Sequence, residues 1–162
     1  MYYKKSCPVP QDQRPLTEYL LLVQSSFSKK IISNTNAYYF QLIKLGLWFF
    51  AFGLIIAILS IGHFRYKILL LDFMFTILLL MFVILRLFLS WKYVSDRLYQ
   101  PTIPYEESGW YDGKIWLKPK SILLQDRLIY EYKIIPVFDR IYQSSFILTI
   151  AFMTTIIILL LL

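Results

Sequence analysis

Residues 104–119, PYEESGWYDGKIWLKP, lie at the centre of the only long polar segment between two hydrophobic spans. Three carboxylates, two glycines, two tryptophans and two tyrosines fall within this stretch. Asp112-Gly113 is a strong two-residue hairpin signal, because a type I′ turn needs positive φ at both central residues. The sequence therefore predicts a hairpin over residues 105–117. The expected cross-strand pairs are Tyr111 with Lys114, Trp110 with Ile115, and Gly109 with Trp116.

Long apolar blocks flank the polar segment. The apolar fraction of the chain is 58%, above the ~45–50% usual for soluble domains. Residues 45–62 and 141–162 carry no charge, and residues 68–91 form a third apolar run. As helices, these runs are about 27 Å or more in length, close to the ~30 Å hydrocarbon core of a bilayer. We expect an α-helical integral membrane protein with two to three transmembrane helices and a small α/β-hairpin surface domain between the second and third.

The N-terminal 44 residues are expected to form an irregular arm followed by an amphipathic helix. Pro15 suits the first turn of a helix. An apolar stripe then follows at helical spacing, and it consists of Leu16, Leu20, Val23 and Phe27. Such a helix either lies on the membrane surface or packs against the rest of the protein, and the sequence favours neither.

Residues 92–140 form the polar surface domain. Beyond the hairpin, the pattern predicts an amphipathic helix over residues 119–132, with Leu124, Leu128 and Tyr132 on one face. Pro136 is expected to break this helix before the last span, because proline lacks the backbone N–H that an α-helix requires.

The basic residues predict how the chain is oriented. The chain has a net charge of +7, but its basic residues form no cluster on a fold known to read nucleic-acid bases. This favours anionic lipid or an acidic protein, rather than nucleic acid, as the binding partner. In a three-span chain the positive-inside rule places the N-terminus and residues 92–140 on the stromal or cytoplasmic side. The cations on that side are Lys29, Lys30, Lys44, Lys92, Arg97, Lys133 and Arg140, against Arg65 and Lys67 on the other. The single cysteine, Cys7, excludes an internal disulfide.

The acidic residues Glu106, Glu107 and Asp112 are candidate metal ligands, because carboxylates are hard oxygen donors suited to Mg²⁺, Ca²⁺ or Mn²⁺. Two adjacent carboxylates on a strand point to opposite faces, which works against shared ligation. No Glu-x-x-His pair and no nucleophile with a base accompanies them, so we expect no enzyme activity. The alternative is that the glutamates are solvated or form ion pairs. Their expected partners are Arg97, Lys114 and Lys118.

Two further groups of residues suggest binding roles. Trp110, Tyr111 and Trp116 are candidate docking anchors, because exposed aromatic residues beside charge dominate many protein contacts. Asp72 and Arg86 are ionisable groups inside the second span, where such residues suggest a functional site. For Asp72 we favour local pairing with Lys67 or Arg65 over an ion pathway. Gly53 and Ala57 form a small-residue face in the first span that suits close helix packing.

Several blocks of the sequence resemble the hypothetical chloroplast reading frame thirty-six family. They are CPVPQDQRPLTEY at residues 7–19, YVSDRL at 93–98, YEESGWYDGKIW at 105–116, Lys118-Pro119, and Asp126-Arg127-Leu128. The resemblance implies a plastid-encoded protein of a photosynthetic membrane, such as the thylakoid. It implies no catalytic residue and no cofactor.

We therefore expect a non-catalytic membrane accessory protein that aids the assembly, stability or acclimation of a membrane complex, with lipid and that complex as its partners. One alternative is a metal- or cofactor-handling membrane protein that uses the acidic hairpin. A third hypothesis is a small oligomeric transporter built around Asp72 and Arg86.

Overall fold

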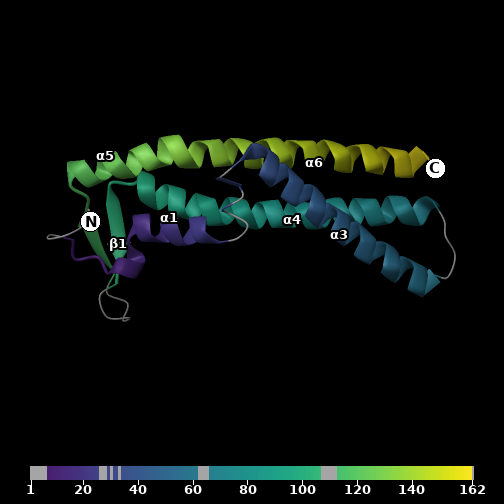
Figure 1. Cartoon of the computed structure of the whole chain (residues 1–162), viewed down its shortest axis with the longest axis horizontal. Helices are drawn as coiled ribbons and strands as arrows, with labels where there is room; N and C mark the ends of the chain where they lie inside the picture. Colours follow the sequence, from purple (N-terminus) through teal and green to yellow (C-terminus); the bar gives the residue numbers. More distant parts are fainter. Residues whose placement is uncertain are drawn as a thin grey trace. The chain divides into compact units, whose positions relative to one another are not determined.

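The computed structural model describes residues 7–25, 29, 31–32, 34–61, 66–106 and 113–161. In this part of the chain the fold is mostly helical, with one two-stranded sheet (Figure 1). The elements are a 3-10 turn at Gln11–Gln13, α1 (Pro15–Gln24), α3 (Thr35–Ile61), α4 (Tyr66–Tyr99), β1 (Thr102–Tyr105), β2 (Lys114–Leu117), α5 (Lys120–Ile129), a π-helical segment (Tyr130–Ile134) and α6 (Ile135–Leu161).

The chain divides into two compact units. The hairpin unit consists of Met1–Ile32 with Leu89–Phe138, and the helical unit consists of Ser33–Phe88 with Asp139–Leu162. The division falls inside α4 and inside α6. The N-terminal arm thus belongs to the same unit as the hairpin, although more than fifty residues separate them in the sequence.

Three helical stretches in the described residues are long and apolar enough to cross a membrane. They cover 25, 34 and 42 residues, and even the shortest is about 37 Å long at 1.5 Å per residue. Their bounds are Thr35–Leu59, Tyr66–Tyr99 and Lys120–Leu161. The mostly helical fold, the three candidate spans and the small hairpin confirm the coarse architecture expected from the sequence. Each stretch begins before the corresponding predicted span.

In the helical unit, α3 and α4 approach each other closely at Gly53. A Cβ atom on Gly53 would lie 1.7 Å from the Asp72 Oδ1 atom, so no larger residue fits without a shift. Phe50 and Phe73 pack edge to face nearby, with ring centroids 6.4 Å apart. The predicted small-residue face of α3 is thus in contact with α4 at Gly53, which fits the close packing that small residues permit between helices.

Pro136 does not break the last helix, contrary to the expectation from the sequence. The helix runs on from α5 through the π-helical segment into α6, with Pro136 as the second residue of α6. The Ile135 amide donates to the Tyr130 carbonyl, five residues back. The wider π turn relieves the clash that a proline ring makes with the preceding turn of a regular α-helix.

Candidate functional site

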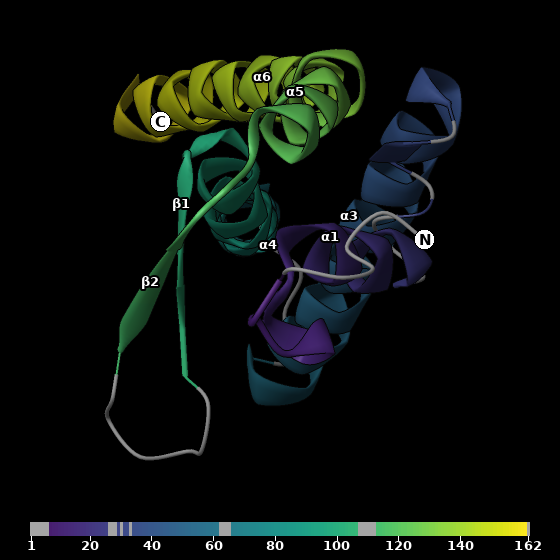
Figure 2. The same cartoon turned by 90° about the vertical axis from the view of Figure 1, so that its left-hand side faces the viewer.

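The hairpin has a different register from the one that Asp112-Gly113 predicts. β1 and β2 are antiparallel, and residues 106–113 connect them (Figure 2). The cross-strand pairs are Thr102–Leu117, Ile103–Trp116, Pro104–Ile115 and Tyr105–Lys114. All three predicted pairs are therefore wrong, because Lys114, Ile115 and Trp116 pair with residues of β1. Their predicted partners were Tyr111, Trp110 and Gly109. Burial favours the observed pairing, because it uses residues 102–105 as the first strand and places Ile103 and Tyr105 in a buried cluster with Val9.

The inner face of the hairpin packs against the N-terminal arm. Val9, Ile103 and Tyr105 form a buried cluster, and Cys7 and Trp116 pack against it while partly exposed. Trp116, one of the predicted docking anchors, thus contacts the hairpin's own core. The other two predicted anchors, Trp110 and Tyr111, lie outside the described residues.

The outer face of the hairpin carries exposed apolar side chains. Ile115 and Leu117 alternate with Trp116 along β2, so their side chains leave the opposite side of the ribbon. Ile115 is 74% exposed and Leu117 is 69% exposed. Pro104, the partner of Ile115, is exposed as well. We call Pro104, Ile115 and Leu117 the outer face.

Gln13 fastens the arm to the end of β1. Its side-chain amide donates to the Glu106 carbonyl oxygen at 3.0 Å, and its amide oxygen accepts from the Glu106 backbone N–H at 2.9 Å. The side chain therefore acts as one extra rung of the sheet. The exposed Glu106 carboxyl stays free of any ion pair within the described residues. Glu107 and Asp112 lie outside them, so the metal hypothesis stays a prediction.

Arg97 joins three segments of the hairpin unit. Its Nη1 donates to the Glu18 Oε1 atom at 2.5 Å and to the Tyr93 hydroxyl at 2.7 Å, and its Nη2 donates to the Gln13 carbonyl at 2.8 Å. Both side chains of the ion pair are mostly buried. Burial raises the pKa of the Glu18 carboxyl, and the Arg97 charge opposes this rise. The forked guanidinium thus binds α1 and the arm to the end of α4.

Lys118 forms the second internal anchor, at the C-terminal end of α4. Its Nζ donates to the Arg97 carbonyl at 2.9 Å, the Leu98 carbonyl at 3.1 Å and Asp126 Oδ2 at 2.6 Å. The Lys118 side chain is 0% exposed and that of Asp126 is 3% exposed. Burial lowers the pKa of Lys118, and Asp126 opposes this shift.

Within the described residues, Arg97 pairs with Glu18 and Lys118 pairs with Asp126, and neither pairs with Glu106. Glu107 lies outside the described residues, so its expected pairing stays a prediction. An ammonium group has three hydrogens to donate, and all three of Lys118 are used within the unit. A cation that serves the unpaired carbonyls of a helix end is a stabilising device. Lys118 therefore has no donor left for a substrate.

The buried faces of α5 and α1 do not coincide with the apolar faces that the sequence predicts for these helices. On α5 the buried residues are Ile122 and Asp126, while Leu124, Leu128 and Tyr132, the last of them in the π-helical segment, are more than half exposed. On α1 the buried residues are Pro15 and Tyr19, and the Tyr19 ring packs edge to face on Trp91 at 6.4 Å. Pro15 occupies the first turn of α1, as the sequence predicts. α1 thus packs against α4 through Tyr19, while Leu20 and Leu21 are exposed. The expectation that α1 lies on the membrane surface stays a prediction.

Asp72 does not pair with Lys67, the local partner expected for it within the described residues. Its carboxylate lies against Gly53, and its Oδ2 atom is buried without a hydrogen-bond partner among the residues that the structure describes. Lys67 precedes Asp72 by five residues, which places it about 140° around the helix. Arg65 lies outside the described residues. Arg86, the other ionisable residue of the span, is exposed on α4.

Sequence reasoning assigned no role to Gln13 or Asp126, although both lie in blocks that carry the family resemblance. Gln13 lies in an arm that looks irregular, and Asp126 lies at a position that looks like the polar side of a surface helix. Each takes its role from a residue that is distant in sequence, 93 positions away for Gln13, and no local pattern reveals such a pairing.

Comparison with known proteins identifies the family. Residues 7–147 match the CGLD27-like family, described as Conserved in the green lineage and diatoms 27. The chain belongs to this family. The match includes the arm, the hairpin, both internal anchors and most of the helical unit, and it confirms the family resemblance of the sequence blocks.

Relatives from several organisms share most of this length. The chain is 35% identical over 144 residues to the uncharacterized protein ycf36 of Porphyra purpurea, covering 88% of this chain and 87% of that one. A ycf36 protein of Cyanophora paradoxa is 34% identical over 149 residues, covering 85% and 88%. The Arabidopsis thaliana protein Conserved in the green lineage and diatoms 27, chloroplastic, is 38% identical over 141 residues, covering 84% of this chain and 42% of its own length. No solved structure matches the chain.

Proposed function

We propose that the protein is a non-catalytic integral membrane protein of the chloroplast that supports the assembly, stability or acclimation of a photosynthetic membrane complex. α3 and those parts of α4 and α6 that belong to the helical unit would cross the membrane. The hairpin unit, which includes α5, would lie on the stromal side, as the positive-inside rule predicts. The chloroplastic Arabidopsis relative and the three long apolar helices support the location.

The observation that carries the docking role is the two-sided character of the hairpin. Its inner face is used internally by Val9 and the arm, whereas Ile115 and Leu117 are exposed on its outer face. Exposed apolar side chains grouped on a rigid ribbon are typical of a surface that a partner covers. Lys118 and Arg97, the strongest polar anchors, are already bound within the unit, which disfavours catalysis by either of them.

The test is a mild-detergent pull-down of the tagged full chain from its own membranes, followed by a native gel and identification of the subunits. We expect the chain to migrate with a photosynthetic complex or an immature form of it. Replacing both Ile115 and Leu117 by alanine should release that complex while leaving the fold intact, because neither side chain is buried in the unit.

Two controls make the result specific. Leu21→Ala removes an exposed leucine of α1 in the same unit and should leave the complex bound. Trp116→Ala should weaken binding only as far as it destabilises the hairpin core. If the double alanine variant keeps its partner and the complex accumulates normally, the outer face is not the docking surface.

A further inference from the structure

The last backbone hydrogen bond of the hairpin fixes which of its backbone groups point outwards. The Lys118 N–H donates to the Pro101 carbonyl at 2.9 Å, so these two residues continue the ladder as a hydrogen-bonded pair. Hydrogen-bonded and non-hydrogen-bonded pairs alternate in an antiparallel ladder, and the N–H and C=O groups of a non-hydrogen-bonded pair point away from the partner strand. The non-hydrogen-bonded pairs are therefore Thr102–Leu117 and Pro104–Ile115.

The outer edge of β1 is occupied by groups of the same unit. Pro104 has no N–H, and its carbonyl accepts from Arg97 Nη2 at 3.4 Å. Glu106 follows at the next outward-facing position, and the Gln13 side chain bonds both of its backbone groups, at 2.9 and 3.0 Å. Another strand cannot pair along this edge without displacing Gln13.

The outer edge of β2 has no such cover. Ile115 and Leu117 each direct one N–H and one C=O group outwards, and these groups make no hydrogen bond within the described residues. Both residues are largely exposed, at 74% and 69%. β2 forms the outer side of the hairpin, with β1 between it and α1 in the view of Figure 2. The hairpin thus has one closed edge and one open edge.

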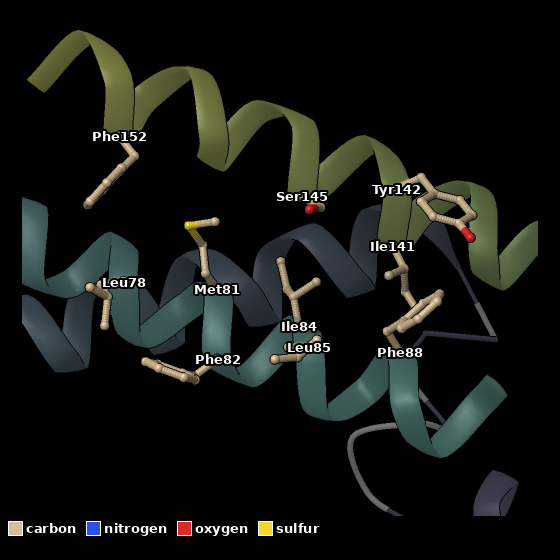
Figure 3. Close-up of a pocket in the computed structure, with 10 residues that line it drawn as sticks. All are labelled: Leu78, Met81, Phe82, Ile84, Leu85, Phe88, Ile141, Tyr142, Ser145 and Phe152. Atoms are coloured by element: carbon tan, nitrogen blue, oxygen red, sulfur yellow. The ribbon is translucent and has the colours of Figure 1, made fainter. Parts of the chain in front are cut away.

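Directed backbone groups distinguish the β2 edge from the apolar surfaces of the helices. The groove between α4 and α6 in the helical unit has a volume of about 540 Å³ and is lined by side chains such as Ile84 and Ile141 (Figure 3). Helical backbone groups are bonded within the helix, so this groove presents shape and apolar contact only. The outward groups of β2 recur about every 6.8 Å, a spacing that another extended chain matches.

We propose that the open edge of β2 pairs with an extended segment of the protein that docks on the outer face. This inference rests on the proposed docking function and names the class of its partner, a segment that adds a third strand to the hairpin. Apolar side chains of that segment beside Ile115 and Leu117 would widen the outer face. The backbone hydrogen bonds would fix the register of the segment.

A second copy of the chain is a less suitable occupant of this edge. Antiparallel pairing of two β2 strands about a two-fold axis would bond Ile115 to Leu117 of the copy. Lys114 would then lie opposite Lys118 of the copy, and like charges directly opposite each other on neighbouring strands are destabilising. The net charge of +7 adds repulsion between copies. These charges favour a different protein.

The test is residue-resolved hydrogen exchange of the tagged full chain, alone in detergent and in the assembly isolated from its own membranes. In the chain alone, the N–H groups of Ile115 and Leu117 should exchange fast, whereas that of Trp116, which points towards β1, should exchange slowly. In the assembly, exchange at Ile115 and Leu117 should slow at least about tenfold, as expected for one backbone hydrogen bond. Unchanged rates at both residues in an assembly that retains the chain would overturn the proposal.

A proline variant tests the same edge. Ile115→Pro removes one outward N–H and leaves the bonds to β1, because position 115 takes no part in them. This variant should lose the assembly. Thr102→Pro is the matched control, since it makes the same change at an outward-facing position of β1, and it should keep the assembly. The exchange rate at Trp116 shows whether each variant keeps its hairpin, and the comparison on the unaltered chain tests the proposal without any substitution.

The outcomes separate this proposal from the docking function on which it rests. If Ile115→Pro keeps the assembly and the double alanine variant of Ile115 and Leu117 loses it, the outer face docks a partner but strand pairing is refuted. If both variants keep the assembly, the docking function fails as well. A chain that migrates as a dimer by itself, with slow exchange at both residues, would show that a second copy occupies the edge and would overturn the proposed partner.

Discussion

The buried Lys118–Asp126 pair allows a quantitative test of what holds the hairpin unit together. Asp126→Asn keeps the shape of the side chain and removes the negative charge. Lys118→Met keeps most of the stem and removes the ammonium group. The double variant, Lys118→Met with Asp126→Leu, removes both charges at once. These three proteins separate the ion pair from the hydrogen bonds that Lys118 makes to α4.

The expected magnitudes follow from the burial and the hydrogen bonds. Each single variant leaves one uncompensated charge at a site that is 3% exposed or less, which costs about 3–5 kcal/mol. The double variant has no unpaired charge, and an apolar replacement of a buried pair is often neutral by itself. It still leaves the carbonyls of Arg97 and Leu98 without their donor, and a buried unpaired carbonyl costs about 1–3 kcal/mol. We therefore expect the double variant to lie between the single variants and the wild type.

The assay is thermal unfolding of the full chain in detergent micelles, monitored through the resistance of the hairpin unit to proteolysis. A unit of this size loses about 4–8 °C in Tm for each kcal/mol, so the single variants should melt at least about 12 °C lower. Lys92→Met provides the control. Lys92 pairs with Asp96 at 2.9 Å, but both side chains are about half exposed, and such a pair contributes about 0.5 kcal/mol or less.

Two results would refute this reasoning. A double variant as stable as the wild type would show that Lys118 does not support the end of α4. Single variants that melt within a few degrees of the Lys92→Met control would show that the pair is hydrated rather than buried.

Three further predictions concern the other anchors. Gly53→Ala should destabilise the chain in thermal melts by about 1–3 kcal/mol, because the new methyl overlaps Asp72. Adding Asp72→Ala should restore the lost stability. Gly46→Ala should have a smaller effect, because its Cβ would lie 3.2 Å from the flexible side chain of Leu80. Arg97→Lys should speed hydrogen exchange in α1, because an ammonium cannot reproduce the fork that holds Glu18 and the arm; unchanged exchange would count against the anchor. The pKa of Glu18 is raised above its ordinary 4.5 in the folded chain. The folded state therefore binds more protons than the unfolded state at pH values between the two pKa values, and stability falls as the pH rises through this window. Glu18→Gln should remove that slope from the profile of Tm against pH.

Secondary structure followed from the sequence where one local rule dominated. Uncharged apolar runs predicted the long helices, and Pro15 predicted the start of α1. Pro136 shows where a local rule failed. Its missing N–H would break an α-helix, but one turn of π-helix accommodates the ring. A rule that treats α-helix and coil as the only choices cannot predict this outcome.

The register of the hairpin was beyond local reasoning for a different reason. Asp112-Gly113 favours a tight turn by a small conformational preference. Ile103 and Tyr105 gain more by burial against Val9 in the observed register, because a fully buried large apolar side chain contributes about 1.5–3 kcal/mol. Val9 lies in an arm with no regular pattern, so the sequence around the hairpin carries no sign of the partner that fixes it.

The distribution of polar contacts in the hairpin unit limits where recognition can occur. Gln13 is used in holding the arm, and Arg97 and Lys118 are used in holding the end of α4. A partner that bound to any of these would have to break an internal contact first, which would weaken the unit that presents it. In the proposed docking role, recognition by the described part of this unit would therefore use side chains whose removal leaves the core intact. Ile115 and Leu117 meet this condition, on a ribbon that Gln13 and Val9 hold to the arm. For this reason the alanine variants of the outer face, rather than those of Trp116, separate a docking defect from a folding defect.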